Sequence, residues 1–387
     1  MSDRDYIVSL TGLRGIAALL VFLYHYSALH PGIRLDLSVP VIGSMLQFPL
    51  GLGGVGVDVF FVLSGFLLTL PFASSALHEG PRPDLGRYFK RRFLRVFPAY
   101  YVQFFIILAV GAWFVTWRPQ TTTTFIAHLF MFFNIGWNPV TPMVGVWWTL
   151  PVEMGFYLLL PLLAPFMRPR RWIFVLLGGL ALSMTYRAWA AAHFEPLGPE
   201  RAFLAAVQLP GSLPEFLLGA SAAIMVRLFQ SENLPGPPAW ARDLVFALGL
   251  LLPALWMWHV VVGAGVEFWL GHWSMIVSPI AIGLPLSLAV MALYWGSRLG
   301  NILLANRYVY YLGLISYSLY LWHFPVMQQI QKMAGEGYAD WPHWIKFPLC
   351  TLAVIGVASL SYLLVERPFY RLKTWRQIFA KRSKPVA

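Results

Sequence analysis

An arginine and a histidine lie inside the first long apolar stretch of the chain, LTGLRGIAALLVFLYHYSAL, where a lipid-facing helix should carry neither. Arg14 and His25 are eleven residues apart, so both side chains project from one face of a helix, with roughly 16 Å of rise between them. Because ionisable side chains inside a membrane helix are costly, they usually face a bundle interior or a wet cavity. The pair indicates a polar pathway through a membrane, with a cation near one end and a titratable imidazole toward the other.

Three further titratable side chains lie in apolar segments. Asp58 is in GGVGVDVFFVLSG, Glu153 in VWWTLPVEMGFYLLLPLL and His323 in RYVYYLGLISYSLYLWHFPV. The expected directions of these segments place all three at broadly the depth of His25, so the four groups could form one polar site. The alternative for His323 and Asp58 is a structural hydrogen bond between helices.

A run of cations in RYFKRRFLRVFP precedes the third apolar segment. Arg92 and Arg95 are three residues apart, so they are neighbours on one helical face. Paired guanidinium groups suit bidentate binding of phosphate. The run predicts a phosphorylated donor that docks on the inner side, with its reactive group reaching outward toward His25. The alternative is a topology signal that anchors the helix to lipid headgroups.

The composition excludes most soluble folds. Hydrophobic residues make up 58% of the 387 residues and charged residues 11%, against about 25% charged in soluble proteins, and the mean hydropathy is +0.65. Continuous apolar runs predict an all-α, polytopic helical bundle in a lipid bilayer and not a β-barrel.

The net charge is +12. The basic residues behind it cluster beside the ends of apolar runs, which argues against nucleic acid as a partner. The single cysteine, Cys350, excludes an intramolecular disulfide and a zinc cluster, and no metal is expected.

About ten transmembrane helices are expected. The predicted spans are 8–29, 53–72, 97–117, 146–166, 172–192, 203–227, 243–262, 273–295, 308–330 and 345–365. The apolar segment 121–136 is too short for a span and reads as an interfacial or re-entrant helix.

The distribution of cations predicts the orientation. With the N-terminus in the cytoplasm, 22 lysines and arginines fall on the cytoplasmic side and six on the other, as the positive-inside rule requires. Those six are Arg34, Arg118, Arg187, Arg201, Lys332 and Lys346. MSDRDYIVSL is unlike a signal peptide, so the first span is expected to be retained. We therefore expect a multi-pass protein of the cytoplasmic membrane with both termini cytoplasmic. Residues 1–372 would form the membrane domain, and 373–387 a basic cytoplasmic tail.

The chain resembles the acyltransferase 3 family of integral membrane acyltransferases over about residues 7–370. Five motifs in order carry the resemblance: LTGLRGIAALLVFLYH, GGVGVDVFFVLSGFLLT, RFLR, VWWTLPVEMGFYLLLP and ISYSLYLWHFPV. The resemblance implies about ten membrane helices. It also implies transfer of an acyl group, most often acetyl, from cytoplasmic acyl-CoA to a hydroxyl of a carbohydrate or glycosylated acceptor.

The resemblance also assigns residues by matching position. His25 matches the catalytic histidine, and Arg14 belongs to the same motif. Arg92 and Arg95 match an arginine pair expected near the CoA, and Glu153 matches the acidic residue after the Trp-Thr-Leu segment. Many members carry a C-terminal esterase-like domain that this sequence does not show, so a separate extracytoplasmic partner protein is expected where the acyl group is passed to a polymer.

Two mechanisms stay open at this stage. His25 could act as general base on the acceptor hydroxyl, with Glu153 orienting the imidazole, or it could carry the acyl group as an acyl-histidine relay. The competing class is a transporter or flippase, in which the same buried charges form a substrate path without acyl transfer.

Overall fold

The computed structural model describes residues 3–30, 53–77, 81–110, 121–137, 139–264, 268 and 271–371. The expected tail, 373–387, lies outside these residues. In chain order the helices are α1 (Asp3–Leu29), α3 (Gly53–Leu77), α4 (Leu85–Val110), α5 (Thr122–Leu129), η2 (Gly145–Trp148), α6 (Thr149–Leu163), η3 (Ala164–Phe166), α7 (Pro169–Phe194), η4 (Glu195–Leu197), α8 (Pro199–Ala206), α9 (Leu213–Ser231), α10 (Ala239–Gly263), α11 (Trp273–Tyr294), α12 (Arg298–Leu304), α13 (Arg307–Leu314), α14 (Ser316–Ala334), η6 (Glu336–Asp340), α15 (His343–Ser361), the π-helical η7 (Tyr362–Glu366) and α16 (Arg367–Arg371).

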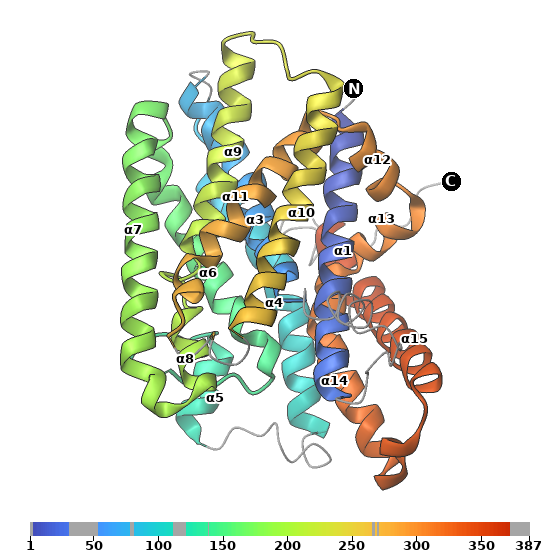
Figure 1. Cartoon of the computed structure of the whole chain (residues 1–387). Coiled ribbons are helices and arrows are strands. Elements are labelled where there is room, and N and C mark those ends of the chain that lie inside the picture. Colours follow the sequence, from blue (N-terminus) through green and yellow to red (C-terminus); the bar gives the residue numbers. More distant parts are fainter. Residues whose placement is uncertain are drawn as a thin grey trace, which may run out of the picture.

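The long helices run side by side along one axis, and the short α5 and α8 lie together at one end (Figure 1). α1 begins at the opposite end, near α12 and the connection between α9 and α10. Within the described residues, nine helices are long and apolar enough to cross a membrane, as judged by length and composition. The protein is therefore a polytopic helical membrane bundle, as the composition predicts.

The predicted span 308–330 is wrong as a single helix. The structure has two helices there, α13 and α14, which meet at Ile315. A Cβ atom on Gly313 would lie 1.9 Å from the carbonyl oxygen of Thr11, so the backbones of α13 and α1 are in direct contact. α14 carries polar side chains that reduce its hydropathy, and Ser316, Ser318 and His323 are buried. The polar side chains of α14 therefore contact other parts of the protein and not lipid. For this reason the segment 308–330 does not form a single lipid-exposed helix.

Two other boundaries differ from expectation. α4 begins at Leu85, twelve residues before the predicted span, so Arg92 and Arg95 lie inside the helix and not in a loop before it. The predicted span 203–227 is divided into α8 and α9, with a turn between Ala206 and Leu213. α5 is eight residues long, too short to cross a bilayer, and Thr121 caps its first turn by accepting a hydrogen bond from the Thr124 N–H at 3.1 Å.

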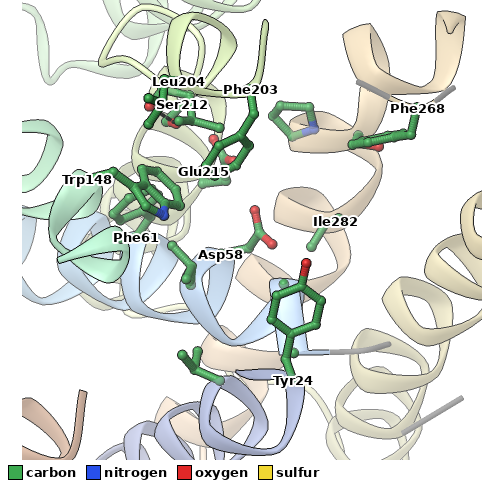
Figure 2. Close-up of a pocket in the computed structure, with 18 of the residues that line it drawn as sticks. Tyr24, Asp58, Phe61, Trp148, Phe203, Leu204, Ser212, Glu215, Phe268 and Ile282 are labelled. Carbon is green, nitrogen blue, oxygen red and sulfur yellow. Dashed lines mark hydrogen bonds between the residues drawn. The ribbon is translucent and has the colours of Figure 1, made fainter. Parts of the chain in front are cut away.

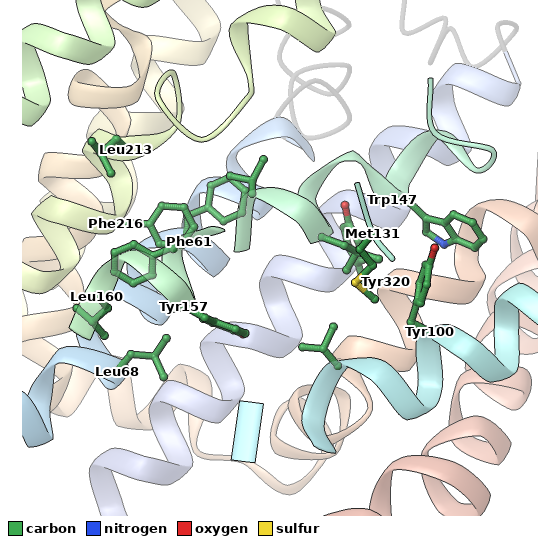
Figure 3. Close-up of a cluster of buried hydrophobic side chains, with 14 of the residues drawn as sticks. Phe61, Leu68, Tyr100, Met131, Trp147, Tyr157, Leu160, Leu213, Phe216 and Tyr320 are labelled. Atoms are coloured by element: carbon green, nitrogen blue, oxygen red, sulfur yellow. The ribbon is translucent and has the colours of Figure 1, made fainter. Parts of the chain in front are cut away.

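The centre of the bundle is the contact between α3 and α9. In each of these helices 67% of the most apolar window is buried, against 22% in α7, α10 and α15. Two glycines allow the contact, since a Cβ on Gly65 would lie 2.2 Å from the Phe216 carbonyl oxygen, and one on Gly219 would lie 2.1 Å from that of Val62. Phe61 and Phe216 stack beside this contact with ring centroids 4.6 Å apart (Figure 3). This rigid centre supports the side chains described next.

Candidate active site

The imidazole of His25, on α1, contacts the imidazole of His323, on α14. The Nε2 atom of His323 lies 3.2 Å from Nδ1 of His25, and the ring centroids are 4.9 Å apart. Nδ1 of His25 also lies 2.9 Å from the carbonyl oxygen of Val21. His25 is half-buried, whereas His323 is fully buried. The structure thus brings together two histidines that are 298 residues apart in the sequence.

The surrounding acceptors assign the protons on this pair. Nδ1 of His323 lies 2.8 Å from the Tyr320 carbonyl oxygen and 3.1 Å from that of Leu319. Carbonyl oxygens only accept, so this nitrogen carries a hydrogen, and Nε2 of the neutral His323 ring is an acceptor. Nδ1 of His25, between that nitrogen and the Val21 carbonyl, is then the donor. Nε2 of His25 is left without a hydrogen, which is the form that a general base requires.

Buried hydrogen bonds hold the segment of α14 that carries His323. The hydroxyl of Tyr320 lies 2.8 Å from that of Thr149 and donates to the Val146 carbonyl oxygen at 2.5 Å. The side chain of Gln103 donates to the Leu321 carbonyl at 2.5 Å and accepts from the indole N–H of Trp147 at 2.9 Å. Figure 3 shows Tyr320 and Trp147 close together in this part of the core. Satisfied buried networks of this kind fix side-chain positions.

His25 lines a cavity of about 400 Å³, here called the histidine cavity. Asp58, Arg187 and Glu215 line it too, and the two carboxyl groups interact with each other and with the guanidinium. Figure 2 shows Asp58 between Glu215 and Tyr24, with the Tyr24 hydroxyl pointing toward the Asp58 carboxyl group. The remaining wall is largely aromatic and aliphatic: Phe61, Trp148, Phe203, Leu204, Phe268 and Ile282.

A second, much smaller pocket of about 40 Å³ is lined by Arg14, Arg95, Glu153 and Ser64, and is here called the arginine pocket. Glu153 accepts hydrogen bonds from Ser64, at 3.1 Å, and from the hydroxyl of Tyr157. These contacts hold the carboxylate among the side chains of this pocket.

The two cavities adjoin. Val57 and Phe61 line both of them. The guanidinium of Arg14 lies 5.6 Å from the ring centroid of Phe60, which precedes Phe61 in α3. Apolar side chains of one helix, α3, therefore form a thin partition between the arginine pocket and the histidine cavity.

A third pocket, of about 340 Å³, lies where α4 begins and is here called the basic pocket. Arg87, Arg91 and Arg92 line it. The guanidinium carbon of Arg92 lies 5.9 Å from the Tyr157 ring centroid, and its Nε is buried with no hydrogen-bond partner within the described residues. Arg92 thus faces the basic pocket while Arg95, three residues on, faces the arginine pocket.

The structure separates the predicted site residues into three groups, one of which is Arg92 alone, in the basic pocket. His25, His323 and Asp58 lie at or beside the histidine cavity. Glu153 lies with Arg14 and Arg95, in the adjoining pocket, and the printed sequence gives no sign of this division. The position that we expected Glu153 to hold, beside the Nδ1 of His25, has His323 and the Val21 carbonyl instead.

Sequence reasoning missed Arg187 and Glu215. The charge count places Arg187 on the non-cytoplasmic side, although the predicted span 172–192 contains it; in the structure it lies inside α7 and is 4% exposed. Glu215 lies in the first turn of α9 and is 3% exposed. The signal that could have found both is an ionisable residue within an apolar segment. Among the described residues, no group of three histidine, cysteine or acidic side chains could hold a metal ion.

The fold and these cavities define a multi-pass membrane protein with adjoining polar sites inside its helical bundle. The chain belongs to the acyltransferase 3 family, whose profile, described as an acyltransferase domain, matches residues 7–363. The protein is therefore a membrane acyltransferase.

Three relatives illustrate the similarity. Nodulation protein 10 of Rhizobium leguminosarum bv. viciae is 27% identical, over 88% of this chain and 88% of its own. "Putative peptidoglycan O-acetyltransferase YrhL" of Bacillus subtilis is 25% identical over 96% of this chain. O-acetyltransferase OatA of Staphylococcus aureus is 24% identical over 95%. The match spans 58% of each of the latter two proteins. No solved structure matches the chain.

Proposed function

We propose that this protein transfers an acyl group, most often acetyl, from cytoplasmic acyl-CoA to a hydroxyl group of a carbohydrate or glycosylated acceptor. One observation carries the proposal. A single helix, α1, presents Arg14 to the arginine pocket and His25 to the histidine cavity, and the two spaces adjoin at Val57 and Phe61. A donor that approaches from one side and an acceptor that approaches from the other would meet at His25.

The donor would enter through the basic pocket. Its phosphates would pair with Arg92, whose buried Nε has no hydrogen-bond partner within the described residues, and with the exposed Arg87 and Arg91 of the same pocket, since guanidinium groups favour bidentate anions. Arg95 and Arg14 continue the cationic path inward along the arginine pocket. The extended pantetheine arm would then carry the thioester past Val57 toward His25, along the roughly 16 Å of α1 that separate Arg14 from His25.

At the thioester, Nε2 of His25 would take the proton of the acceptor hydroxyl while that oxygen attacks the thioester carbonyl. Collapse of the tetrahedral intermediate breaks the C–S bond, and the imidazolium returns its proton to the departing thiolate of CoA. In the relay version, Nε2 attacks the carbonyl itself and CoA leaves as the thiolate, which gives a cationic acyl-imidazole. The acceptor hydroxyl then attacks the acyl carbon, the C–N bond breaks, and the hydroxyl proton passes to the thiolate, so that neutral His25 and the CoA thiol result. Both versions need the unprotonated Nε2 that His323 favours.

In this scheme Glu153 has a different task from the one expected of it. Its hydrogen bonds to Ser64 and Tyr157 hold a negative charge beside Arg14 and Arg95, where it would balance the arginines when no donor is bound. His323 takes over the orientation of the imidazole. It is a positioning residue, since it would act on the reaction only through His25.

The orientation remains part of the proposal: both termini cytoplasmic, in the cytoplasmic membrane. A pocket of about 540 Å³ brings Arg82 together with Arg168 and Arg171, and shares Phe72 and Pro83 with the basic pocket. One end of the bundle therefore collects cations from the α3–α4 connection, from α4 and from the start of α7. Such an end faces the cytoplasm under the positive-inside rule.

The test uses inverted membrane vesicles that contain the full-length protein and acetyl-CoA labelled in the acetyl group. We expect release of CoA to be matched by label in the carbohydrate fraction, and both to require His25. A transporter or flippase of the same fold would bind or move its substrate with no acetyl group transferred. Vesicles with wild-type protein that show no more labelled carbohydrate than vesicles with His25→Ala would overturn the proposal.

A further inference from the structure

We infer that the histidine cavity is the acceptor site and that it takes an uncharged pyranose, whose ring hydroxyls are bound by Glu215 and Asp58. This inference rests on the proposed function for its role in the reaction. The binding itself is argued from the cavity alone.

An unsatisfied carboxyl oxygen is the first sign of a missing ligand. Oε2 of Glu215 is buried and has no hydrogen-bond partner within the described residues, although the side chain is only 3% exposed. Buried polar atoms nearly always have a partner, and an exception needs an explanation. The Glu215 side chain is hydrogen-bonded to that of Asp58, so the two carboxyl groups share a proton. A hydroxyl group of a bound molecule, which both donates and accepts, would supply the partner that Oε2 lacks.

The aromatic wall is the second sign. Trp148 and Phe203 meet edge to face with centroids 5.3 Å apart, and both border the cavity together with Phe61 and Tyr24 (Figure 2). A cavity of about 400 Å³ falls in the roughly 300–1,000 Å³ range of small-molecule sites, which combine apolar walls with a few polar groups. A pyranose matches this mixture, since its hydroxyls lie around the ring edge and its C–H groups form apolar faces.

The charge of the lining excludes acidic sugars. Arg187 is the only lysine or arginine among the described residues that line the cavity. Its guanidinium already donates to the carbonyl oxygens of Met275, at 2.7 Å, Gly211, at 3.2 Å, and Ala206, at 3.3 Å. A uronic acid would add a third carboxyl group where Asp58 and Glu215 already share the charge of Arg187. Like charges repel each other more strongly in a poorly solvated site than in water.

The same carboxyl groups argue against a plain lipid alcohol. A long-chain alcohol has one hydroxyl, which could pair with Oε2 of Glu215, but its apolar chain would then face the carboxyl group of Asp58, which lines the same cavity. A ring with several adjacent hydroxyls would satisfy both carboxyl groups together. The experiment therefore compares the binding of neutral sugars with that of a simple alcohol.

The test is a binding measurement that needs no donor. Purified full-length protein in detergent is mixed with methyl glycosides of glucose, galactose, mannose and N-acetylglucosamine, with the matching methyl glucuronide and galacturonide, and with cyclohexanol. Saturation-transfer NMR detects weak binding of each. We expect signals from at least one neutral glycoside and none from the uronides or cyclohexanol.

Two variants locate the signals in the cavity. Gly54→Phe fills it, because Gly54 lines the cavity and a Cβ there meets no atom within 4 Å. Glu215→Gln keeps the shape but changes the unpartnered acceptor. The matched control is Gly178→Phe, at an exposed glycine of α7 that is equally open. We expect Gly54→Phe to abolish the glycoside signal, Glu215→Gln to reduce it at least severalfold, and the control to match wild type.

Three outcomes overturn the inference: no neutral glycoside binds, the signals survive Gly54→Phe, or the uronides or cyclohexanol bind as well as the neutral sugars. Failure of the proposed function looks different. If glycosides bind as described but acetyl-CoA labels no carbohydrate, the site stands and the reaction falls. If labelling depends on His25 yet is unchanged by both Gly54→Phe and Glu215→Gln, the reaction stands and this site falls.

Discussion

The arginine pocket and the histidine cavity share a wall, yet they are built differently. The arginine pocket measures about 40 Å³, and its carboxylate, Glu153, is held by hydrogen bonds from Ser64 and Tyr157. The histidine cavity measures about 400 Å³, has aromatic walls and leaves one oxygen of Glu215 without a partner among the residues that the structure describes. The arginine pocket is narrow and its carboxylate is hydrogen-bonded within the described part of the protein, whereas the histidine cavity is wide and has a carboxyl oxygen that is not.

The difference matches two kinds of ligand. Under the proposal, the fixed charges of the narrow pocket meet a chemically constant acyl donor, since preorganised groups lose little entropy on binding. At about 40 Å³ this pocket borders the path of the donor's arm and does not enclose it. A wide cavity with an unpartnered acceptor suits a variable molecule that brings its own donors. The predictions below test this division between a donor side and an acceptor side, from the largest expected effect to the smallest.

Loss of the His25 imidazole should have the largest effect, because the proposed donor and acceptor both react at this side chain. For His25→Ala we expect the rate of acetyl transfer to fall by about 10²–10⁴-fold, the usual contribution of a positioned general base. Transfer of label from acetyl-CoA to carbohydrate measures it, with the amount of membrane-inserted protein as the control. Residual transfer above a tenth of the wild-type rate would remove His25 from the chemistry.

Loss of the arginine pair should affect only the donor side. Arg92→Ala combined with Arg95→Ala should raise the KM for acyl-CoA at least about tenfold, since a hydrogen bond to a charged group contributes roughly 1.5–3 kcal/mol. The KM for the acceptor should stay unchanged. Arg170→Ala, an exposed arginine of α7, is the control. An unchanged KM for acyl-CoA would return the pair to a role in topology alone.

Loss of the second imidazole should act through the first. His323→Leu removes the acceptor beside Nδ1 of His25, and a lost buried partner costs about 1–3 kcal/mol, so kcat should fall about tenfold with both KM values little changed. His323→Gln keeps an acceptor near the same place and should retain more activity. The pH profile of kcat should move in the leucine variant but not in the glutamine variant. Equal losses in the two variants would indicate a packing role only.

A larger side chain in the partition should slow the meeting of the two substrates. Val57→Phe thickens the wall that both cavities share and so narrows the passage between them. We expect a severalfold lower kcat with an unchanged KM for acyl-CoA. Val261→Phe, at an exposed valine of α10, is the matched control. A kcat equal to wild type in Val57→Phe would show that the acyl group does not pass this wall.

Two of the relations between candidate site residues could be predicted from the sequence, because each joins residues of one helix. Arg14 and His25 lie on one uninterrupted helix, so helical geometry alone relates them, and the same holds for Arg92 and Arg95 on α4. The acceptor side could not be predicted in this way. Asp58, Arg187 and Glu215 come from three different helices, α3, α7 and α9, and only packing brings them together.

The break between α13 and α14 shows a further limit. Hydropathy predicts one span over 308–330, because a sliding sum cannot tell an apolar face turned to lipid from a polar face turned to protein. The backbone contact at Gly313 and the burial of Ser318 and His323 depend on α1 and on the rest of the bundle. The same neighbours decide that His323, and not Glu153, contacts His25.

The amino-acid sequence by itself determined the membrane class, nearly all of the spans and the relation between residues on one helix, since these follow from composition and from the helical repeat. The tertiary structure decided which helices touch, and with that the histidine pair, the two adjoining cavities and the carboxyl oxygen that lacks a partner. The reason is physical: the helical repeat relates neighbours along one chain segment, whereas a site between helices depends on close packing of side chains that no local pattern encodes.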